Sequence, residues 1–474
     1  MKTCKLRLNG KVYDQLRHHL FSGDGLESIA FALCGKLETE NELIYTIHRL
    51  ELYANEKCTI RQVDRVEWEP AEIVHLFEEC RKNQLHLLKI HCHPKHWPFF
   101  SLTDDNSDIQ LIDTVTGWTG RDDDIFSVIM LPDGSLFGRS INSTGSFTPL
   151  KSIVVISDNI LVYTGLPASE NPTIIEEEED IQLRTRQAFG EGTTNILKSL
   201  KIGVVGCSGT GSIVAELLAR LGVGQLVLVD YDIVERKNIN RILNTTIDDA
   251  QSSNKKVDVI KTAIDRMGTG VNVISITDDL HSFKAYEAIA ACDIVYGCMD
   301  TVDGRHLLNR IATYFCSAYL DIGIHLDADG KGGINEVFGR VDYIQPGGSS
   351  LLSRGRYTLE HLKAADIART NPEEHDRQVK EGYIKSARVS SPAVISINMM
   401  FSSQAVTELL ARLHPFRDLS NAKYASICFS VSGFLLINEP DGSPDIELQT
   451  KVGAGAKTPI LDSPLLILPK WIER

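Results

Sequence analysis

The sequence lacks paired cysteines, long apolar runs and a secretory leader, and each absence excludes a class of protein. Its ten cysteines are scattered, and no two of them form a C-x-x-C pair. This spacing excludes a disulfide framework and a thiolate zinc site, and it predicts reduced, buried thiols. No stretch approaches the roughly 18 apolar residues of a membrane-spanning helix, and the N-terminus has no apolar signal-peptide core. We therefore expect a cytoplasmic protein without membrane attachment.

The chain also lacks a concentrated run of basic residues. Its formal net charge is −14 over 474 residues, whereas a general nucleic-acid binder needs a Lys/Arg face to neutralise phosphates. Hydrophobic residues make up 43% and charged residues 24%, a balance typical of globular proteins. This length exceeds one ordinary core, so we expect two domains and no nucleic-acid partner.

Composition divides the chain into four stretches. The first mixes short apolar segments with one helical pattern, which is typical of a small α/β domain. Two prolines and the acidic cluster 176–180 then favour a solvated linker, and the last stretch is rich in Pro, Gly and Asp. The predicted organisation is a domain over 1–165, a linker over 166–182, a second domain over 183–440 and a C-terminal tail over 441–474.

The second domain begins with a βαβ pattern. Lys201–Val205 is an apolar strand, 206–211 is a glycine turn, 212–221 has helical periodicity and Gln225–Val229 is a second strand. Further buried strands follow along the chain. The pattern predicts a Rossmann-like α/β domain with a mostly parallel sheet.

The densest chemical signal in the first domain is a histidine pair followed by an acid. His91 and His93 are two residues apart on a strand end, so their side chains point the same way. Asp104 supplies a third ligand after a turn and leaves a fourth tetrahedral position for water. This arrangement favours a catalytic zinc ion, whereas a lone histidine would more often be an ordinary strand-end residue.

The spacing His-x-His, seven residues, Ser, two residues, Asp resembles the motif of JAB/JAMM metalloproteases. The resemblance implies a cytidine-deaminase-like layered fold, zinc on His91, His93 and Asp104, and an oxyanion contact from Ser101. It also implies that an upstream glutamate is the general base. Glu27, which precedes an apolar run ending in glycine, is the candidate.

The glycine turn fits a phosphate-binding loop. Gly206, Gly209 and Gly211 follow a strand and open a helix, so backbone N–H groups can face a phosphate chain. This motif alone is equally compatible with an NAD-binding domain, in which Asp230 at the end of the next strand would bind the ribose.

Motifs around the turn resemble the ThiF/MoeB and ubiquitin-activating-enzyme family. They are Asp230-x-Asp232-x-Val234 with Asn238-x-x-Arg241, Arg184-Thr185-Arg186-Gln187, Lys256, and Cys298-x-Asp300. The resemblance implies that Arg241 and Lys256 clamp the phosphates of ATP and that Asp300 holds Mg²⁺. It further implies that Asp230 binds the ribose, that Asn238 contacts the nucleotide, that Asp232 belongs to the site, and that Arg186 reaches the ATP of a partner subunit in a homodimer.

The chain departs from that family where relatives often carry cysteines after a Pro-Gly element. Here Ser350 and Ser353 stand in their places, so a structural zinc site is not expected in this domain. Two explanations remain: the domain adenylates its substrate for direct attack by a partner's nucleophile, or one of these serines accepts the acyl group as an oxyester. Direct transfer is favoured because serine is a poor nucleophile without a base.

The two resemblances together predict an enzyme that activates a ubiquitin-like protein with ATP and also processes or deconjugates it with zinc. A conjugating enzyme is an implied partner, as in bacterial ubiquitin-like conjugation systems, some of them linked to phage defence. The alternative is a sulfur-carrier adenylyltransferase for cofactor or thionucleoside synthesis. A non-enzymic scaffold is disfavoured because both sets of site residues are complete.

Overall fold

The computed structural model describes residues 2–165, 181–380, 393–457 and 460–462 in two compact units. The first unit holds the described residues up to 165, together with Thr313–Cys316 and the described part of Thr450–Asp462. The second holds the remaining described residues. The predicted linker and tail boundaries stay predictions, because 166–180 and 463–474 lie outside the described residues.

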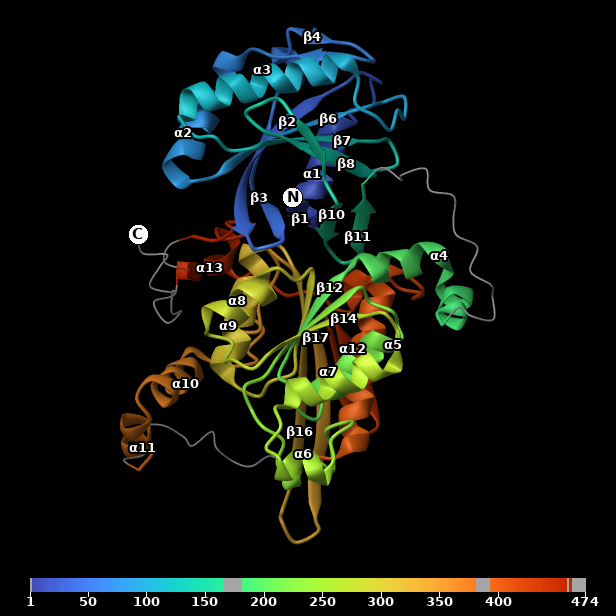
Figure 1. Ribbon diagram of the computed structural model, residues 1–474, viewed down its shortest axis with the longest axis vertical. Coiled ribbons are helices and arrows are strands. Elements are labelled where there is room, and N and C mark those ends of the chain that lie inside the picture. The colour runs from blue at the N-terminus through green and yellow to red at the C-terminus, as the bar shows by residue number, and fades with distance from the viewer. Residues whose placement is uncertain (1, 166–180, 381–392, 458–459, 463–474) are drawn as a thin grey trace. The chain divides into compact units, whose positions relative to one another are not determined.

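The first unit is built on a nine-stranded mixed sheet (Figure 1). From edge to edge its strands are β11 (Ile160–Thr164), β10 (Ser152–Ile156), β1 (Thr3–Asn9), β3 (Glu42–Leu52), β2 (Ile29–Glu38), β6 (His86–Cys92), β7 (Ile125–Met130), β8 (Leu136–Ile141) and β9 (Phe147–Pro149). A separate small sheet pairs β4 (Ile60–Arg61) with β5 (Val66–Glu67).

Helices cover both faces of this sheet. Alternate residues of β2 enter two cores: Ala30 and Ala32 pack with α1 (Gly10–Leu20), and Ile29 and Phe31 pack with α2 (Val74–Asn83) and α3 (Leu102–Thr119). Because β2 is buried on both faces, its sequence is a continuous apolar run instead of an alternating one. The predicted α/β class of this unit is confirmed.

Two segments that are far from the N-terminal residues in sequence pack into the first unit. The Thr46 hydroxyl donates to the Gly453 carbonyl at 2.9 Å, the Gly453 N–H donates to the Thr313 carbonyl at 3.0 Å, and Arg7 donates to the Phe315 carbonyl at 3.4 Å. Gly453 has φ +66°, and a Cβ there would lie 2.0 Å from the Ile47 carbonyl oxygen. Residues 450–457 and 460–462 are therefore part of the first unit, whereas the sequence predicted a tail over this range.

The second unit carries an eight-stranded sheet within the described residues (Figure 1). In order, its strands are β14 (Asn272–Ile276), β13 (Gln225–Val229), β12 (Lys201–Val205), β15 (Ile294–Gly297), β16 (Ala318–Ala328), β17 (Ile334–Ile344), β18 (Ser426–Ser430) and β19 (Leu435–Glu439). The first five are parallel, as predicted for a Rossmann-like domain. β17, β18 and β19 each pair antiparallel with the strand before them in this order. Short turns that join β16 to β17 and β18 to β19 require antiparallel pairing there. The sequence did not predict this part of the sheet.

Helices flank the parallel strands. Figure 1 shows α5, α7 and α12 together, with α8 and α9 on the other side. The helices of this unit are α4 (Leu183–Ser199), α5 (Gly211–Arg220), α6 (Ile247–Gln251), α7 (Lys256–Met267), α8 (Phe283–Ala290), α9 (Val302–Tyr314), α10 (Leu359–Thr370), α11 (Pro372–Lys380), α12 (Ile395–Leu413) and α13 (Ile446–Gln449). Of the helices described in either unit, none has the length and hydrophobicity needed to span a bilayer. All ten cysteines are free, and all except Cys58 are buried.

Candidate functional site

The structure brings the predicted zinc ligands of the first unit together. His91 lies near the end of β6, His93 follows that strand, and Asp104 lies in the first turn of α3. Nε2 of His91 is 3.0 Å from Oδ1 of Asp104 and 3.2 Å from Nε2 of His93. One potential ligand atom from each residue falls within 4.8 Å of the other two. The three side chains can therefore bind one ion.

Neighbouring groups fix the orientation of two of these ligands. Nδ1 of His93 is 2.8 Å from the Trp97 carbonyl oxygen, so Nε2 of His93 is the nitrogen turned toward Asp104. Ser101 is the N-cap of α3, and its N–H and hydroxyl both donate to Oδ2 of Asp104 at 2.7 Å. The Ser101 hydroxyl is thus hydrogen-bonded to Asp104, and the oxyanion contact that the resemblance implied stays a prediction.

Glu27 lies beside the cluster, as the sequence predicted. It precedes β2, it is only 4% exposed, and its Oε1 is 3.9 Å from Nε2 of His93. Burial raises the pKa of the Glu27 carboxyl to about 8. A carboxyl group in this position can exchange a proton near neutral pH, which is the property of a general base.

The donor set fits a zinc ion. Two imidazole nitrogens and one carboxylate oxygen are zinc donors, and three protein ligands leave one coordination position for water. Burial lowers the pKa of His91, whereas contacts with Asp104, Trp97 and Glu27 outweigh burial and raise the pKa of His93. Burial would raise the pKa of Asp104, but hydrogen bonds from both histidines outweigh it and lower that pKa. Neutral imidazoles and an ionised carboxylate are the forms that bind metal.

The glycine loop of the second unit is sterically tight. Gly206 has φ +88°, and a Cβ on Gly211 would lie 1.9 Å from the Gly206 carbonyl oxygen. A Cβ on Gly209 would lie 2.3 Å from Nδ2 of Asn398, on α12. Glycine is therefore required at 206 and 211, whereas a side chain at 209 would displace Asn398, a neighbour of the loop to which the sequence assigned no role.

Asp230 connects this loop with Lys256. Its carboxylate accepts from the Cys207 N–H at 2.7 Å and from the Asp232 N–H at 2.9 Å. Nζ of Lys256, which begins α7 and is 5% exposed, is 2.6 Å from Oδ2 of Asp232 and 3.9 Å from Oδ1 of Asp230. Asp230 therefore braces the loop, and the ribose contact that the resemblance implied stays a prediction.

The other predicted nucleotide contacts lie at the same end of the sheet. Arg241 is partly exposed and donates to the Lys237 carbonyl at 2.7 Å, and its Cδ would be 3.5 Å from a Cβ on Gly209. Asn238 is buried, and its side chain accepts from the Glu235 N–H at 3.0 Å. That bond makes Asn238 part of a turn that supports Arg241.

Carboxylates follow the C-terminal ends of three parallel strands, β13, β14 and β15. Asp300 follows β15 and is exposed. Burial raises the pKa of the Tyr231 hydroxyl, and so do, in decreasing order, the charges of Asp232, Asp279, Asp230 and Asp300. All four charges therefore act on Tyr231, but the group of three side chains found to converge for a metal ion within the described residues is His91, His93 and Asp104. A Mg²⁺ site at Asp300 stays a prediction.

Ser350 and Ser353 form one hydrogen-bonded turn. Ser350 is 2% exposed, and its hydroxyl donates to Oδ2 of Asp445 at 2.5 Å. The Ser350 N–H donates to Oγ of Ser353 at 2.9 Å, and the Ser353 N–H donates to Oγ of Ser350 at 3.1 Å. Ser353 is exposed. The sequence did not predict Asp445, which lies 95 residues along the chain from Ser350.

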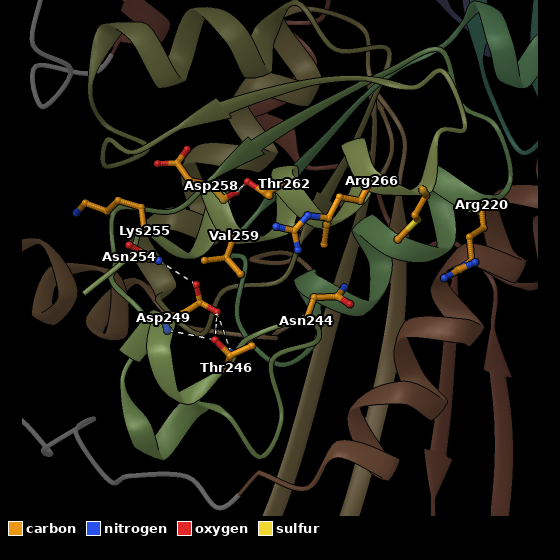
Figure 2. Close-up of a pocket in the computed structure, with 12 residues that line it drawn as sticks. Arg220, Asn244, Thr246, Asp249, Asn254, Lys255, Asp258, Val259, Thr262 and Arg266 are labelled. Atoms are coloured by element: carbon orange, nitrogen blue, oxygen red, sulfur yellow. Dashed lines mark hydrogen bonds between the residues drawn. The ribbon is translucent and has the colours of Figure 1, made fainter. Parts of the chain in front are cut away.

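A recess of about 790 Å³ lies beside α5 and α7 (Figure 2). Arg220, Asn244, Lys255 and Arg266 are among the residues that line it. Lys256, the neighbour of Lys255, is not among them, nor is any glycine of the loop. The recess is therefore distinct from the predicted nucleotide site.

Comparisons with known proteins cover the second unit. A model of the ThiF family matches residues 180–427. Ubiquitin-like modifier-activating enzyme 5 of Culex quinquefasciatus is 25% identical over 218 residues, which are 43% of this chain and 48% of that enzyme. Molybdopterin-synthase adenylyltransferase of Haemophilus influenzae is 36% identical over 115 residues, which are 24% of this chain and 46% of that enzyme.

Among solved structures, E. coli MccB with ATP has a TM-score of 0.43 and 17% identity, and the match covers 57% of this chain and 74% of MccB. The chain spans about half the length of the two curated relatives above. The JAB/JAMM resemblance of the first unit lies outside the matched range and stays a prediction.

Proposed function

The chain belongs to the ThiF family, and on this premise we propose that its second unit uses ATP to adenylate the C-terminal carboxylate of a ubiquitin-like or sulfur-carrier protein. The observation that carries the proposal is the glycine loop linked through Asp230 to the buried Lys256. A buried ammonium beside a glycine loop that opens a helix is suited to the phosphates of a nucleotide.

Attack of a carboxylate on the α-phosphate of ATP requires alignment and charge neutralisation more than proton transfer. Lys256, held by Asp232, and Arg241, supported by the Asn238 turn, would neutralise the phosphates. Asp300 would hold Mg²⁺, which supplies further charge neutralisation when bound. Arg186 would reach the site of a partner subunit in a homodimer, as the family resemblance implies.

Nucleotide choice tests this proposal against the alternative of a dehydrogenase-like domain. Titration calorimetry of the full-length protein is expected to give saturable binding of ATP with magnesium and no measurable binding of NAD⁺. The ThiF-family match and the buried ammonium of Lys256 favour this result. Tight NAD⁺ binding without ATP binding would contradict the proposal.

The two substrate classes differ in the fate of the adenylate. A ubiquitin-like protein would pass to a conjugating enzyme and then to a target, whereas a sulfur carrier would end as a thiocarboxylate. A ubiquitin-like modifier occurs in the name of one relative that matches this chain, and adenylyl transfer in the name of another. Mass spectrometry of the carrier's C-terminus after incubation with ATP and a sulfur donor distinguishes the two substrate classes.

For the first unit we propose zinc-dependent hydrolysis that trims or removes the same ubiquitin-like protein. His91, His93 and Asp104 would hold the ion, which supplies Lewis acidity toward water and a carbonyl group when bound. Glu27 would accept a proton near His93, and Ser101 would keep Asp104 oriented. The convergence of the three ligand atoms supports this assignment.

Direct transfer from the adenylate is favoured over an oxyester on Ser350. We expect no ATP-dependent ester on Ser350 or Ser353, because the Ser350 hydroxyl is buried and already donates to Asp445. The test is peptide mapping by mass spectrometry after incubation with ATP, magnesium and the carrier, in a Glu27→Ala background that preserves adducts. An alkali-labile adduct at either serine would contradict direct transfer.

Ser350→Ala should lower the free energy of unfolding by about 1–3 kcal/mol, because Asp445 loses a buried donor.

A further inference from the structure

Buried charged side chains lie beside the proposed zinc ligands, at the interface of β6 and α3. Lys89 lies two residues before His91 on β6, and Asp108 lies four residues after Asp104 on α3. Two strand residues span about 6.6 Å and four helical residues about 6 Å, so the two separations match. The Lys89–Asp108 ion pair therefore repeats the His91–Asp104 contact one step along the same interface.

A third charge links this pair to another strand. Arg139, on β8, places Nη2 and Nε at 2.7 and 3.1 Å from Oδ2 of Asp108, and its Nη1 at 2.5 Å from Oδ1 of Asp105. Lys89 also donates to the Ser107 hydroxyl at 3.3 Å. Charged side chains on two strands thus hold successive residues of α3.

Burial makes this arrangement unusual for a purely stabilising element. Asp108 is fully buried, Lys89 is 2% exposed and Arg139 is 8% exposed. Desolvation of buried ions offsets most of their attraction, and well-packed apolar residues often stabilise such a position equally well. Directional contacts between buried charges instead favour one register of the helix over others.

We propose that Lys89, Asp108 and Arg139 form a positioning network that fixes α3 against β6 and so holds the Asp104 carboxylate at His91 and His93 for metal binding. The inference rests on the proposed zinc site. Asp104 is carried by the first turn of α3, one helical turn before Asp108, so a shift of the helix would move Asp104 away from both imidazoles. Outer residues that orient ligands in this way contribute about 10- to 100-fold to metal affinity.

The test is Asp108→Asn in the full-length protein, which keeps the side-chain size and removes the charge. Zinc affinity is measured by competition with a chromophoric chelator, and ligand geometry by the visible absorption of bound Co²⁺. We expect zinc binding about 10- to 100-fold weaker than in the wild type and altered Co²⁺ bands. The matched control is Glu42→Gln, which breaks the Lys5–Glu42 ion pair between β1 and β3 (2.9 Å). Its zinc affinity and Co²⁺ spectrum should be unchanged even where its unfolding midpoint falls.

If Asp108→Asn does not fold, Arg139→Lys takes its place. It keeps the charge but loses the simultaneous contacts with Asp105 and Asp108, and should give a smaller loss of zinc affinity with the same direction of spectral change. Zinc affinity within threefold of the wild type in the folded variant would overturn the positioning role alone. A wild-type protein that binds no zinc would overturn the proposed hydrolase, and the positioning role with it.

Discussion

Asp104→Ala is expected to abolish zinc binding by the first unit and with it hydrolysis of a fusion to the cognate ubiquitin-like protein. Asp104 contributes the only carboxylate of the three ligand side chains identified among the described residues, and its two oxygens face both histidines. Because residues that merely orient ligands are worth about 10- to 100-fold in affinity, loss of a ligand should weaken zinc binding by more than about 100-fold. Elemental analysis and chelator competition measure the effect.

The control for this experiment is Asp113→Ala. Asp113 is an exposed carboxylate on the same helix, so it matches the change in charge and side-chain size. It should retain zinc and hydrolytic activity, and both variants should retain adenylation. A wild-type protein that carries no zinc, with a peptidase activity indifferent to chelators, would be incompatible with the proposed hydrolase.

Arg241→Ala and Asp300→Ala are each expected to reduce ATP–pyrophosphate exchange by about 10²- to 10³-fold. This is the usual effect of removing one preorganised charge contact from a site where charge develops in the transition state. The exchange assay reports the adenylation step alone, with a ubiquitin-like protein from a neighbouring gene as the acyl donor. Hydrolysis by the first unit should be unaffected.

Arg236→Ala is the matched control for Arg241→Ala. Arg236 is exposed and lies five residues before Arg241 in the same connection between β13 and α6. Its loss should change exchange by less than threefold. Exchange that is unchanged in both the Arg241 and Asp300 variants would remove these residues from the proposed mechanism.

The parts of both sites that the sequence predicted best are local in the chain. His91 and His93 share a face because the side chains of a strand alternate between its two faces. Asp104 follows after a single loop, in the first turn of the next helix. The glycine loop could be predicted in the same way, because a strand, a turn and a helix follow one another directly. In these segments the spacing of the residues already determines their geometry.

Other parts depend on residues that are distant in the chain. Arg139 reaches Asp108 from β8, and Asp445 reaches Ser350 from a segment near the C-terminus. No periodic pattern links such partners, because their contact exists only once the sheet and helices have packed. The sequence therefore predicted which side chains converge and where the loop lies, but not the distant groups that contact them.

One feature of the second sheet could have been predicted and was not. The turn between β16 and β17 contains Asp329, Gly330, Gly332 and Gly333, and the side chain of Asp329 accepts from the N–H groups of Lys331 and Gly333. Asp and Gly between two apolar segments favour a hairpin. This signal indicates the antiparallel extension that the prediction of a mostly parallel sheet left out.

Because the first unit includes segments from late in the sequence, it cannot finish folding early in synthesis. A ribosome makes the N-terminal 165 residues first, and domains generally fold as they emerge. The hydrogen bonds from Thr46 to Gly453 and from Gly453 to Thr313 cannot form until nearly the whole chain has been made. The first unit is thus finished only after the second has been made, and a chain that stops before residue 450 would carry the first unit without its closing segment.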